Sequence, residues 1–395
     1  MTDTLQPLER DAMAEAAPIT HPAPERRRKL GGVTRAEVVS LLAAAGSALA
    51  LDWLLYERVL PFSGAQGFLL LWYLFFLGLT YAIGVAQWPA LHVRERLVSL
   101  VAWSAGLLLF VLIGLQLSFL VIRGRTALGH ANFLTQTMIH TSAVSTLDSG
   151  GALHAVVGTL EQIGLATLFA VPLGIAAAVY LSEVGGRAAR PVRILVEAMT
   201  ALPSIVAGLF VLGVVILTAG LEPSGFAASL ALTVMMMPII TRAAEVVIRL
   251  VPGTLREASL ALGASQWRTV WNVVLPTARP GLATAVILGM ARGIGETSPV
   301  LLTAGFTAGM NYNAFSGHQV SLPLYIWNYI RQPYPVMVTR GFAAALTLML
   351  LVLVLFVTAR VIGGNRPGGP TRRQRPVSEP QSADPQALAR PAATR

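Results

Sequence analysis

An arginine and a glutamate, Arg292 and Glu296, stand four residues apart in the otherwise apolar stretch 281–302. On a helix, residues at this spacing share one face. A guanidinium donates paired hydrogen bonds in a geometry that matches an oxyanion, and the nearby glutamate lowers the net positive charge. Thr297 and Ser298 follow directly and add hydroxyl donors. The group has the chemistry of an anion site that binds weakly enough to release its ligand, as a conduit requires.

A second arginine, Arg242, lies in another apolar stretch, 225–249. A central arginine in a membrane-spanning helix costs about 2.5–3.5 kcal/mol of insertion free energy, so such residues face the bundle interior and commonly mark a substrate path. Two alternatives stay open. Arg292 and Glu296 can form an internal ion pair that only fixes helix packing. Arg242 can contact Glu245 or extend its guanidinium toward the cytoplasmic surface.

The composition indicates a polytopic membrane protein. Of the 395 residues, 54% are hydrophobic and 12% are charged, and the mean hydropathy is +0.65. These values exceed what a soluble chain of this length needs to bury a core. The net charge of +10 does not indicate nucleic-acid binding, because the arginines gather in short hydrophilic segments beside apolar runs. The absence of cysteine and the scattered histidines predict no metal site.

The chain lacks the lysine motif of a nucleotide-binding loop. Lys29 is the single lysine among 29 basic residues, and it precedes Leu-Gly-Gly. A P-loop of the form G-x-x-x-x-G-K-[ST] needs a serine or threonine after its lysine. We therefore expect no cofactor in this chain, and any ATP and Mg²⁺ to be bound by a partner ATPase.

Eight stretches are long enough to cross a bilayer core of about 30 Å as helices of about 20 residues. They are 38–57, 66–87, 97–122, 153–181, 193–219, 225–249, 279–303 and 340–362. We predict an all-α, polytopic transmembrane bundle, with N-terminal spans within 36–122 and a core within 150–363.

The arginine-rich segments predict the orientation. The loops 88–96, 182–192 and 250–278 are basic, which is typical of cytoplasmic loops. The end segments 1–35 and 364–395 are polar and rich in proline and arginine, typical of disordered tails. We therefore expect a multi-pass protein of the cell membrane with both termini in the cytoplasm.

The third of these loops has the pattern of a helical hairpin. Thr254 and Glu257 have the spacing of a capping box, which predicts a helix that begins at Thr254. Gly263 ends this helix, and Pro276 and Pro280 close a second short helix. Four apolar side chains would then be exposed in the cytoplasm unless a partner covered them: Leu255, Leu260, Leu262 and Trp267. An amphipathic interfacial hairpin without a partner is the alternative.

This hairpin resembles the "EAA…G…I-x-L-P" loop of ABC-type importer permeases. The motif positions are carried here by Glu257, Ala258, Ser259, Gly263, Val273, Leu275 and Pro276. Ser259 stands where the family usually has a second alanine, a change between small residues. In that family the loop docks onto the ATP-binding subunit, so the resemblance implies that these residues couple the chain to an ATPase.

The resemblance extends over residues 150–363. The segments "GTLEQIGLATLFAVPLGIAAAVYLSE", "LPSIVAGLF", "MMMPIITRAAEVVIRLVP" and "ARGIGETSPVLLTAGF" are similar to the permease subunits of the high-affinity phosphate importer. "GETSPVLLTAGF" and "SLPLYIWNYI" are more similar to A-type subunits (PstA) than to C-type subunits (PstC). The likeness implies a MetI-like core with a phosphate pathway formed by Arg242, Arg292, Glu296, Thr297 and Ser298. The first two spans have no counterpart in the usual six-span subunit.

The resemblance also implies partners: a PstB-like ATPase, a PstC-like second permease subunit in a heterodimer, and a PstS-like extracytoplasmic phosphate-binding protein. Permeases for molybdate or sulfate share the coupling loop and remain an alternative. An ion-coupled secondary transporter would need more intramembrane ionisable residues than Glu161, Glu245 and Glu296. A membrane-embedded hydrolase would need a G-x-S-G motif or a facing serine and histidine, which the sequence does not offer, so we expect no enzyme activity.

Overall fold

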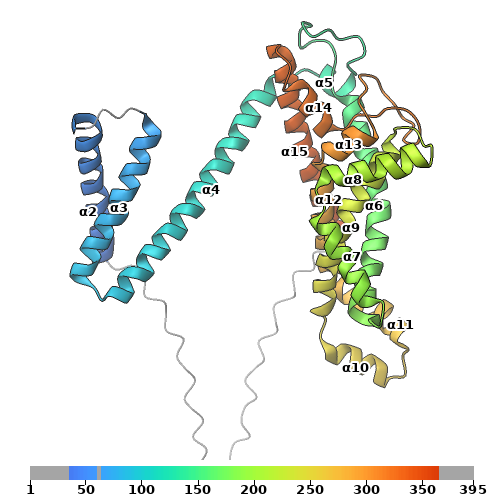
Figure 1. Cartoon of the computed structure of the whole chain (residues 1–395), viewed down its shortest axis with the longest axis horizontal. Helices are drawn as coiled ribbons and strands as arrows, with labels where there is room; N and C mark the ends of the chain where they lie inside the picture. Colours follow the sequence, from blue (N-terminus) through green and yellow to red (C-terminus); the bar gives the residue numbers. More distant parts are fainter. Residues whose placement is uncertain (1–34, 60–63, 364–395) are drawn as a thin grey trace, which may run out of the picture. The chain divides into compact units, whose positions relative to one another are not determined.

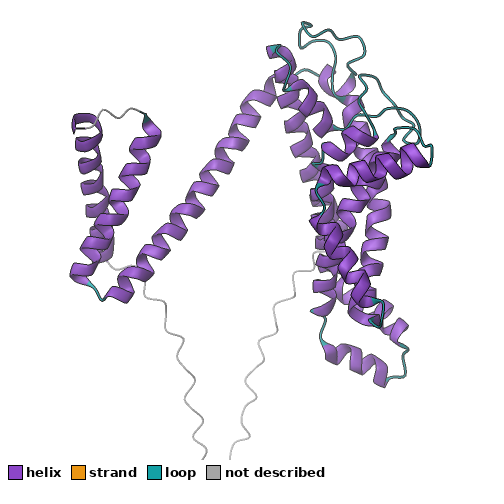
Figure 2. Ribbon diagram, in the orientation of Figure 1, coloured by secondary structure: helices purple, strands orange, loops and turns teal. Residues whose placement is uncertain are grey.

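The computed structural model describes residues 35–59 and 64–363 (Figure 1). All regular elements in these residues are helical, as the sequence predicts (Figure 2). Seven helices are long and apolar enough to cross a membrane, and an eighth crossing is formed if one bent pair of helices counts as a span. The tails predicted at 1–35 and 364–395 lie outside the described residues, except for Arg35. The chain divides into two compact units between Ile113 and Gly114.

The N-terminal unit is a helical hairpin followed by the first part of a long helix. Its elements are α2 (Arg35–Trp53), the π-helical turn η1 (Leu54–Val59), α3 (Ala65–Gln87) and the first part of α4 (Ala90–Leu128). The indole of Trp72 donates to the carbonyl of Ala45 at 3.3 Å and joins α3 to α2. An ion pair of 3.0 Å between Glu37 and Arg96 joins the start of α2 to the start of α4.

The C-terminal unit contains the rest of α4 and all later elements. They are α5 (Asn132–Thr135), α6 (Leu153–Val179), η2 (Tyr180–Val184), α7 (Ala189–Ala201), α8 (Ser204–Val211), η3 (Leu212–Thr218), α9 (Gly225–Arg249), α10 (Gly253–Ala261), α11 (Gln266–Thr269), η4 (Val270–Val274), α12 (Leu275–Ile294), α13 (Ser298–Thr303), α14 (Leu322–Tyr329) and α15 (Pro335–Gly363). Helix α9 forms the centre and packs against α6, α7, α8 and α12. Helix α15 packs against α12 and α14.

Glycines allow α6 and α12 to approach α9 closely. A Cβ atom on Gly289 of α12 would lie 2.4 Å from Ile240 of α9, and one on Gly174 of α6 would lie 2.9 Å from the same side chain. Ile240 is fully buried. Small residues at such contacts stabilise membrane bundles, because van der Waals packing replaces the hydrophobic driving force that lipid cannot supply.

Replacing Gly289 with valine is therefore expected to destabilise the bundle by about 1–3 kcal/mol through overpacking against Ile240. The matched control is Gly164→Val, because Gly164 lies on α6 with no atom within 4 Å of its Cβ position. Apparent melting temperatures of the two variants in detergent measure the difference. Equal melting temperatures would show that Ile240 can move aside.

The fifth predicted span, 193–219, is not a straight helix. The chain instead bends by 108° between α7 and α8. Pro203 lacks the N–H that a continuing helix needs, and a residue before proline is driven out of the helical region. Leu202 accordingly has φ −67° and ψ 129°. The stretch 193–219 therefore counts as one predicted span only if this bent pair crosses the membrane as a unit.

The seventh predicted span, 279–303, is also interrupted. Helix α12 ends at Ile294, and α13 begins only at Ser298. At the other end, Pro276 and Pro280 do not close a helix as predicted, because α12 continues through both. The wide turn η4 ends at Val274, directly before α12. Such turns change the backbone hydrogen-bonding pattern at the point where a proline cannot donate.

Candidate functional site

Arg292 and Glu296 form an ion pair in the structure, the contact that the sequence left open as an alternative to an anion site. Nη1 of Arg292 donates to Oε1 of Glu296. The two residues do not share one continuous helix, however, since Arg292 lies in the last turn of α12 and Glu296 lies beyond its end. The amide of Glu296 donates to the carbonyl of Gly293 at 3.2 Å, which turns the carboxylate back toward the arginine.

The two members of the pair differ in burial. The side chain of Arg292 is 50% exposed, whereas that of Glu296 is 8% exposed. A guanidinium in a helix of membrane-spanning length and composition cannot face lipid without a large cost in free energy. The face of α12 that carries Arg292 must therefore be covered by a second protein chain or by water. Both alternatives from the sequence, an anion contact and a packing pair, are compatible with this geometry.

The short helices α8 and α13 pack against each other next to the break after α12. A Cβ atom on Gly208 of α8 would lie 2.7 Å from Pro299 of α13, so these short helices are in close contact. Thr297 precedes α13, Ser298 is its first residue, and both are half-buried. Within residues 64–363, neither of their side-chain hydroxyls forms a hydrogen bond. In membrane transporters, interrupted helices at mid-bundle commonly supply polar groups to a substrate.

A small cavity with both polar and apolar lining adjoins Glu296. Its polar lining comes from Thr159 and Gln162 of α6, from Glu296 and from Ser321. Nε2 of Gln162 donates to Oε1 of Gln319 at 3.2 Å, and Gln319 in turn donates to Glu161. The buried hydroxyl of Ser321 has no hydrogen-bond partner among the described residues. The sequence could not predict this network, because Gln162 and Gln319 are 157 residues apart.

Arg242, the remaining residue of the predicted pathway, lies in a separate cluster of charged side chains. It forms ion pairs with Glu197 of α7 at 2.5 Å and with Glu245 at 3.9 Å. Glu245 is buried and also pairs with Arg193 at 2.9 Å and with Arg249 at 2.5 Å. The contact to Glu245 was an alternative from the sequence. The sequence analysis did not predict that Glu245 pairs with three arginines. The spacing of four residues between Glu245 and Arg249 could have indicated one of these ion pairs.

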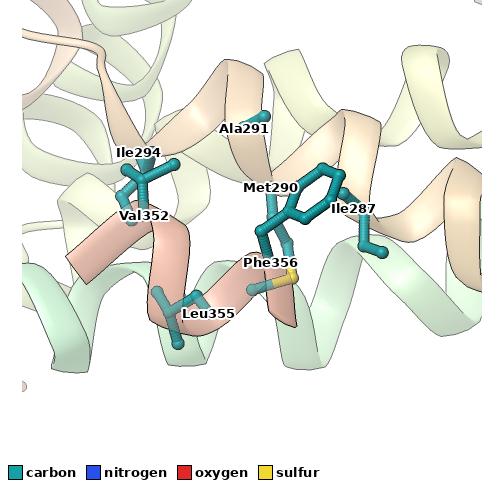
Figure 3. A pocket seen from close by; sticks show the side chains of 7 residues that line it. All are labelled: Ile287, Met290, Ala291, Ile294, Val352, Leu355 and Phe356. Carbon is teal, nitrogen blue, oxygen red and sulfur yellow. The ribbon is translucent and has the colours of Figure 1, made fainter. Parts of the chain in front are cut away.

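A separate pocket between α12 and α15 is apolar throughout (Figure 3). The side chains of Met290, Leu355 and Phe356 converge in it. Its complete lining is Ile287, Met290, Ala291, Ile294, Val352, Leu355 and Phe356. An anion would lose its hydration there without gaining any hydrogen bond, so this pocket is not a candidate for an anion path.

The predicted coupling hairpin is formed by α10 and α11, which lie at one end of the bundle (Figure 1). Helix α10 begins at Gly253 and has Pro252 as its N-cap, so the predicted capping box of Thr254 is wrong. Gly263 ends the helix as predicted, with φ +82°. Glu257 and Ala258 are exposed, and the hydroxyl of Ser259 lies 2.9 Å from that of Thr269.

The hairpin leaves apolar surface uncovered within this chain. Leu255, Leu260, Leu262 and Trp267 are all exposed, as expected from the sequence. The last three motif positions lie elsewhere: Val273 is in η4, and Leu275 and Pro276 start α12. The motif therefore covers both the hairpin and the helix that leads away from it.

An arginine fastens the hairpin to the bundle. Arg256 of α10 donates to both carboxylate oxygens of Glu183 in η2, at 2.7 and 3.2 Å. It also donates to the carbonyls of Ile248 at 2.8 Å and Val251 at 2.6 Å. A bidentate arginine–carboxylate contact restricts geometry more than a single hydrogen bond does. Through these contacts, a movement of α10 would also move the segments that carry Glu183 and Ile248.

Residues 170–363 match the family described as binding-protein-dependent transport system inner membrane component. A phosphate transport system permease protein PstA 1 of Mycobacterium tuberculosis (strain ATCC 25618 / H37Rv) is 44% identical over 215 residues, which cover 54% of this chain and 70% of that protein. A phosphate transport system permease protein PstA of Mycobacterium leprae (strain TN) is 39% identical over 262 residues, which cover 66% of this chain and 86% of that protein. A chain in the crystal structure of a bacterial ABC transporter involved in the import of the acidic polysaccharide alginate is 16% identical, with a TM-score of 0.49 over 68% of this chain and 96% of that chain.

Proposed function

Because the chain belongs to the PstA family of phosphate transport system permease proteins, we propose that it is a membrane-spanning subunit of an ATP-driven importer of inorganic phosphate. The observation that carries the proposal is the 44% identity over 215 residues to a phosphate permease protein. The chain is a multi-pass inner membrane protein and a transport component, not an enzyme.

In this proposal Arg292 contacts the passing phosphate and Glu296 moderates its charge. The half-exposed guanidinium of Arg292 keeps donors free although Glu296 accepts one of its hydrogen bonds. Thr297 and Ser298 contribute hydroxyl donors at the break between α12 and α13. Arg242, whose side chain is 39% exposed, contributes a further positive charge to the pathway. A conduit needs such fixed positive charge together with a nearby acid that prevents tight retention.

Arg292 also supports the proposed subunit composition. Its exposed half needs a covering surface, and a second permease subunit of the PstC type supplies that surface in a heterodimer. Phosphate then passes between the two subunits. An extracytoplasmic, PstS-like phosphate-binding protein delivers the ion at the end of the bundle opposite α10 and α11.

The hairpin α10–α11 is the proposed docking site for a PstB-like ATPase. Glu257, Ala258, Ser259 and the turn at Gly263 form its centre, and the uncovered leucines and Trp267 provide apolar contact area. Val273, Leu275 and Pro276 connect the hairpin to α12, which carries Arg292. ATP and Mg²⁺ are bound by that partner, and we expect both termini of this chain in the cytoplasm because of its arginine-rich loops.

Transport by the assembled complex in proteoliposomes tests the proposal. We expect ATP-dependent uptake of radiolabelled phosphate that depends on the binding protein and persists in an excess of sulfate or molybdate. Preferred uptake of labelled sulfate or molybdate would assign the chain to another oxyanion importer. Uptake driven by an ion gradient without ATP would reject the ABC mechanism.

A further inference from the structure

Arg340 is a fully buried arginine that the proposed pathway does not use. It lies in the first turns of α15 and is 1% exposed, the largest side chain so enclosed in the described residues. Among these residues no carboxylate lies within ion-pair distance of it. Its nearest titratable neighbours are the phenols of Tyr325 and Tyr329 on α14. Burial raises the pKa of Tyr329 to about 12, so this phenol stays neutral and supplies no counter-charge.

The guanidinium of Arg340 holds the backbone of the loop 141–151 instead. Nη2 donates to the carbonyls of Thr146 at 2.6 Å and Ser149 at 2.7 Å, with that of Ser145 farther away at 3.5 Å. Burying a charge is costly unless hydrogen bonds compensate for the lost water. Here the compensation comes from the loop carbonyls together with a contact of Nη1 to the sulfur of Met337 at 3.4 Å, so the charge and the loop conformation depend on each other.

The same loop is fastened from a second side. Nδ2 of Asn132 donates to the carbonyls of Leu147 and Gly150, both at 2.8 Å. The amide of Gly150 donates to Oε1 of Gln136 at 3.0 Å. The next residue, Gly151, packs so closely that a Cβ atom on it would lie 2.4 Å from the carbonyl oxygen of Asn132. The loop therefore has one backbone conformation although it contains no helix or strand.

The fastened loop presents a row of side chains to solvent. Alternate residues are exposed, namely Ser142, Val144, Thr146 and Asp148, while those between them are half-buried. Asp148 is the only formal charge in the row. Within the C-terminal unit, α5 and α14 lie at the end of the bundle opposite α10 and α11 (Figure 1), and the loop is bound to α5 through Asn132. If α10 and α11 meet the ATPase, this row faces the extracytoplasmic side.

We propose that the loop 141–151 is a preorganised docking surface for the extracytoplasmic phosphate-binding protein, and that Arg340 is the positioning residue that sets its shape. The inference rests on the proposed function, which requires that partner. A surface whose backbone is already ordered binds without the entropy cost of ordering it on contact. We expect the partner surface to carry a basic group opposite Asp148 and a small apolar patch opposite Val144. The side chain of Asp148 is 80% exposed although one carboxylate oxygen lies 3.5 Å from Nε2 of His130.

The test measures binding of the purified phosphate-binding protein to the complete transporter in nanodiscs, together with phosphate uptake in proteoliposomes. Arg340→Met removes the donors at similar side-chain length. We expect its dissociation constant for the binding protein to rise at least about tenfold, with maximal uptake at saturating binding protein unchanged. Hydrogen exchange in residues 141–151 should become faster. Arg340→Lys, which keeps a charged donor, should fall between Arg340→Met and the unaltered chain.

Val144→Trp tests the surface without disturbing Arg340. Its side chain is exposed, so folding and loop protection should stay intact while affinity for the binding protein falls at least about tenfold. Arg331→Met is the matched control, because Arg331 lies near the same end and stacks on Trp327 at 4.4 Å without touching the loop. It should leave the affinity unchanged.

Two outcomes would overturn the inference. In the first, Arg340→Met speeds exchange in the loop but leaves the dissociation constant unchanged. In the second, Val144→Trp binds the phosphate-binding protein as the unaltered chain does. Because binding is measured without transport, both outcomes are distinct from a failure of the proposed function, in which the unaltered complex transports no phosphate.

Discussion

Replacing Arg292 with alanine is expected to lower ATP-dependent phosphate uptake at least about a hundredfold, by analogy with the loss of rate when one donor to an oxyanion is removed from an enzyme. The substitution removes the proposed anion contact and leaves the buried carboxylate of Glu296 without its ion-pair partner. The measurement is uptake of radiolabelled phosphate in proteoliposomes. Size-exclusion chromatography of the same preparation shows whether the complex stays assembled.

The matched control is Arg249→Ala. Arg249 also pairs with a glutamate at four residues' separation, and its side chain is 52% exposed, close to the 50% of Arg292. Its partner Glu245 keeps Arg193 at 2.9 Å. Uptake by this variant should stay within about twofold of the unaltered chain, because partly exposed pairs contribute little.

The double variant Arg292→Met/Glu296→Gln separates the pathway role from a packing role. It removes both charges together, and a buried ion pair replaced by neutral side chains of similar size often costs little stability. If Arg292 contacts phosphate, the double variant stays inactive. If uptake recovers, the pair serves only to fix the break after α12, and the anion contact is wrong.

The second large effect is expected at Gly263. Its φ of +82° is strained for a β-branched residue, while no atom lies within 4 Å of its Cβ position. Gly263→Val should therefore act through the backbone of the turn alone. A strain of about 1–3 kcal/mol at the centre of the docking hairpin is expected to weaken ATPase binding and uptake together, by about tenfold or more. Co-purification of the ATPase subunit and phosphate uptake measure the two effects.

Two variants bracket this result. Gly263→Asn should retain most binding and transport, because asparagine tolerates the left-handed conformation. Gly220→Val places the same strain, at φ +74° with open space, in the turn before α9 and should leave ATPase binding intact. Full binding and full uptake by Gly263→Val would mean that the ATPase does not depend on this turn.

The sequence predicted those features that depend on local composition. Long apolar stretches predicted the membrane-spanning helices. The spacing of four residues indicated that Arg292 and Glu296 lie close together. A glycine between helix-forming segments predicted the turn at Gly263. Each depends on residues close together in the chain, where periodicity and turn chemistry apply.

Features that depend on tertiary contacts were missed or predicted wrongly. The prolines show the limit well, since Pro203 bends the chain by 108° whereas Pro276 and Pro280 lie inside a continuous helix. The difference lies in the preceding turn and the surrounding packing, which composition does not encode. The contact between Gln162 and Gln319, and that of Arg340 with the carbonyls of a distant loop, join segments more than 150 residues apart.

The helix that leads from the docking hairpin has a mechanical consequence. Helical structure is continuous from Gln266 to Ile294, a length of 29 residues. At about 1.5 Å per residue this is a rod of roughly 43 Å. A tilt of about 5° at one end would move the other by nearly 4 Å, more than the length of a hydrogen bond of about 3 Å. If the ATPase binds α10 and α11, a tilt small enough to leave the contacts between the ATPase and these helices intact would still move Arg292 by several ångströms. A movement of that size is sufficient to form or break a hydrogen bond of Arg292.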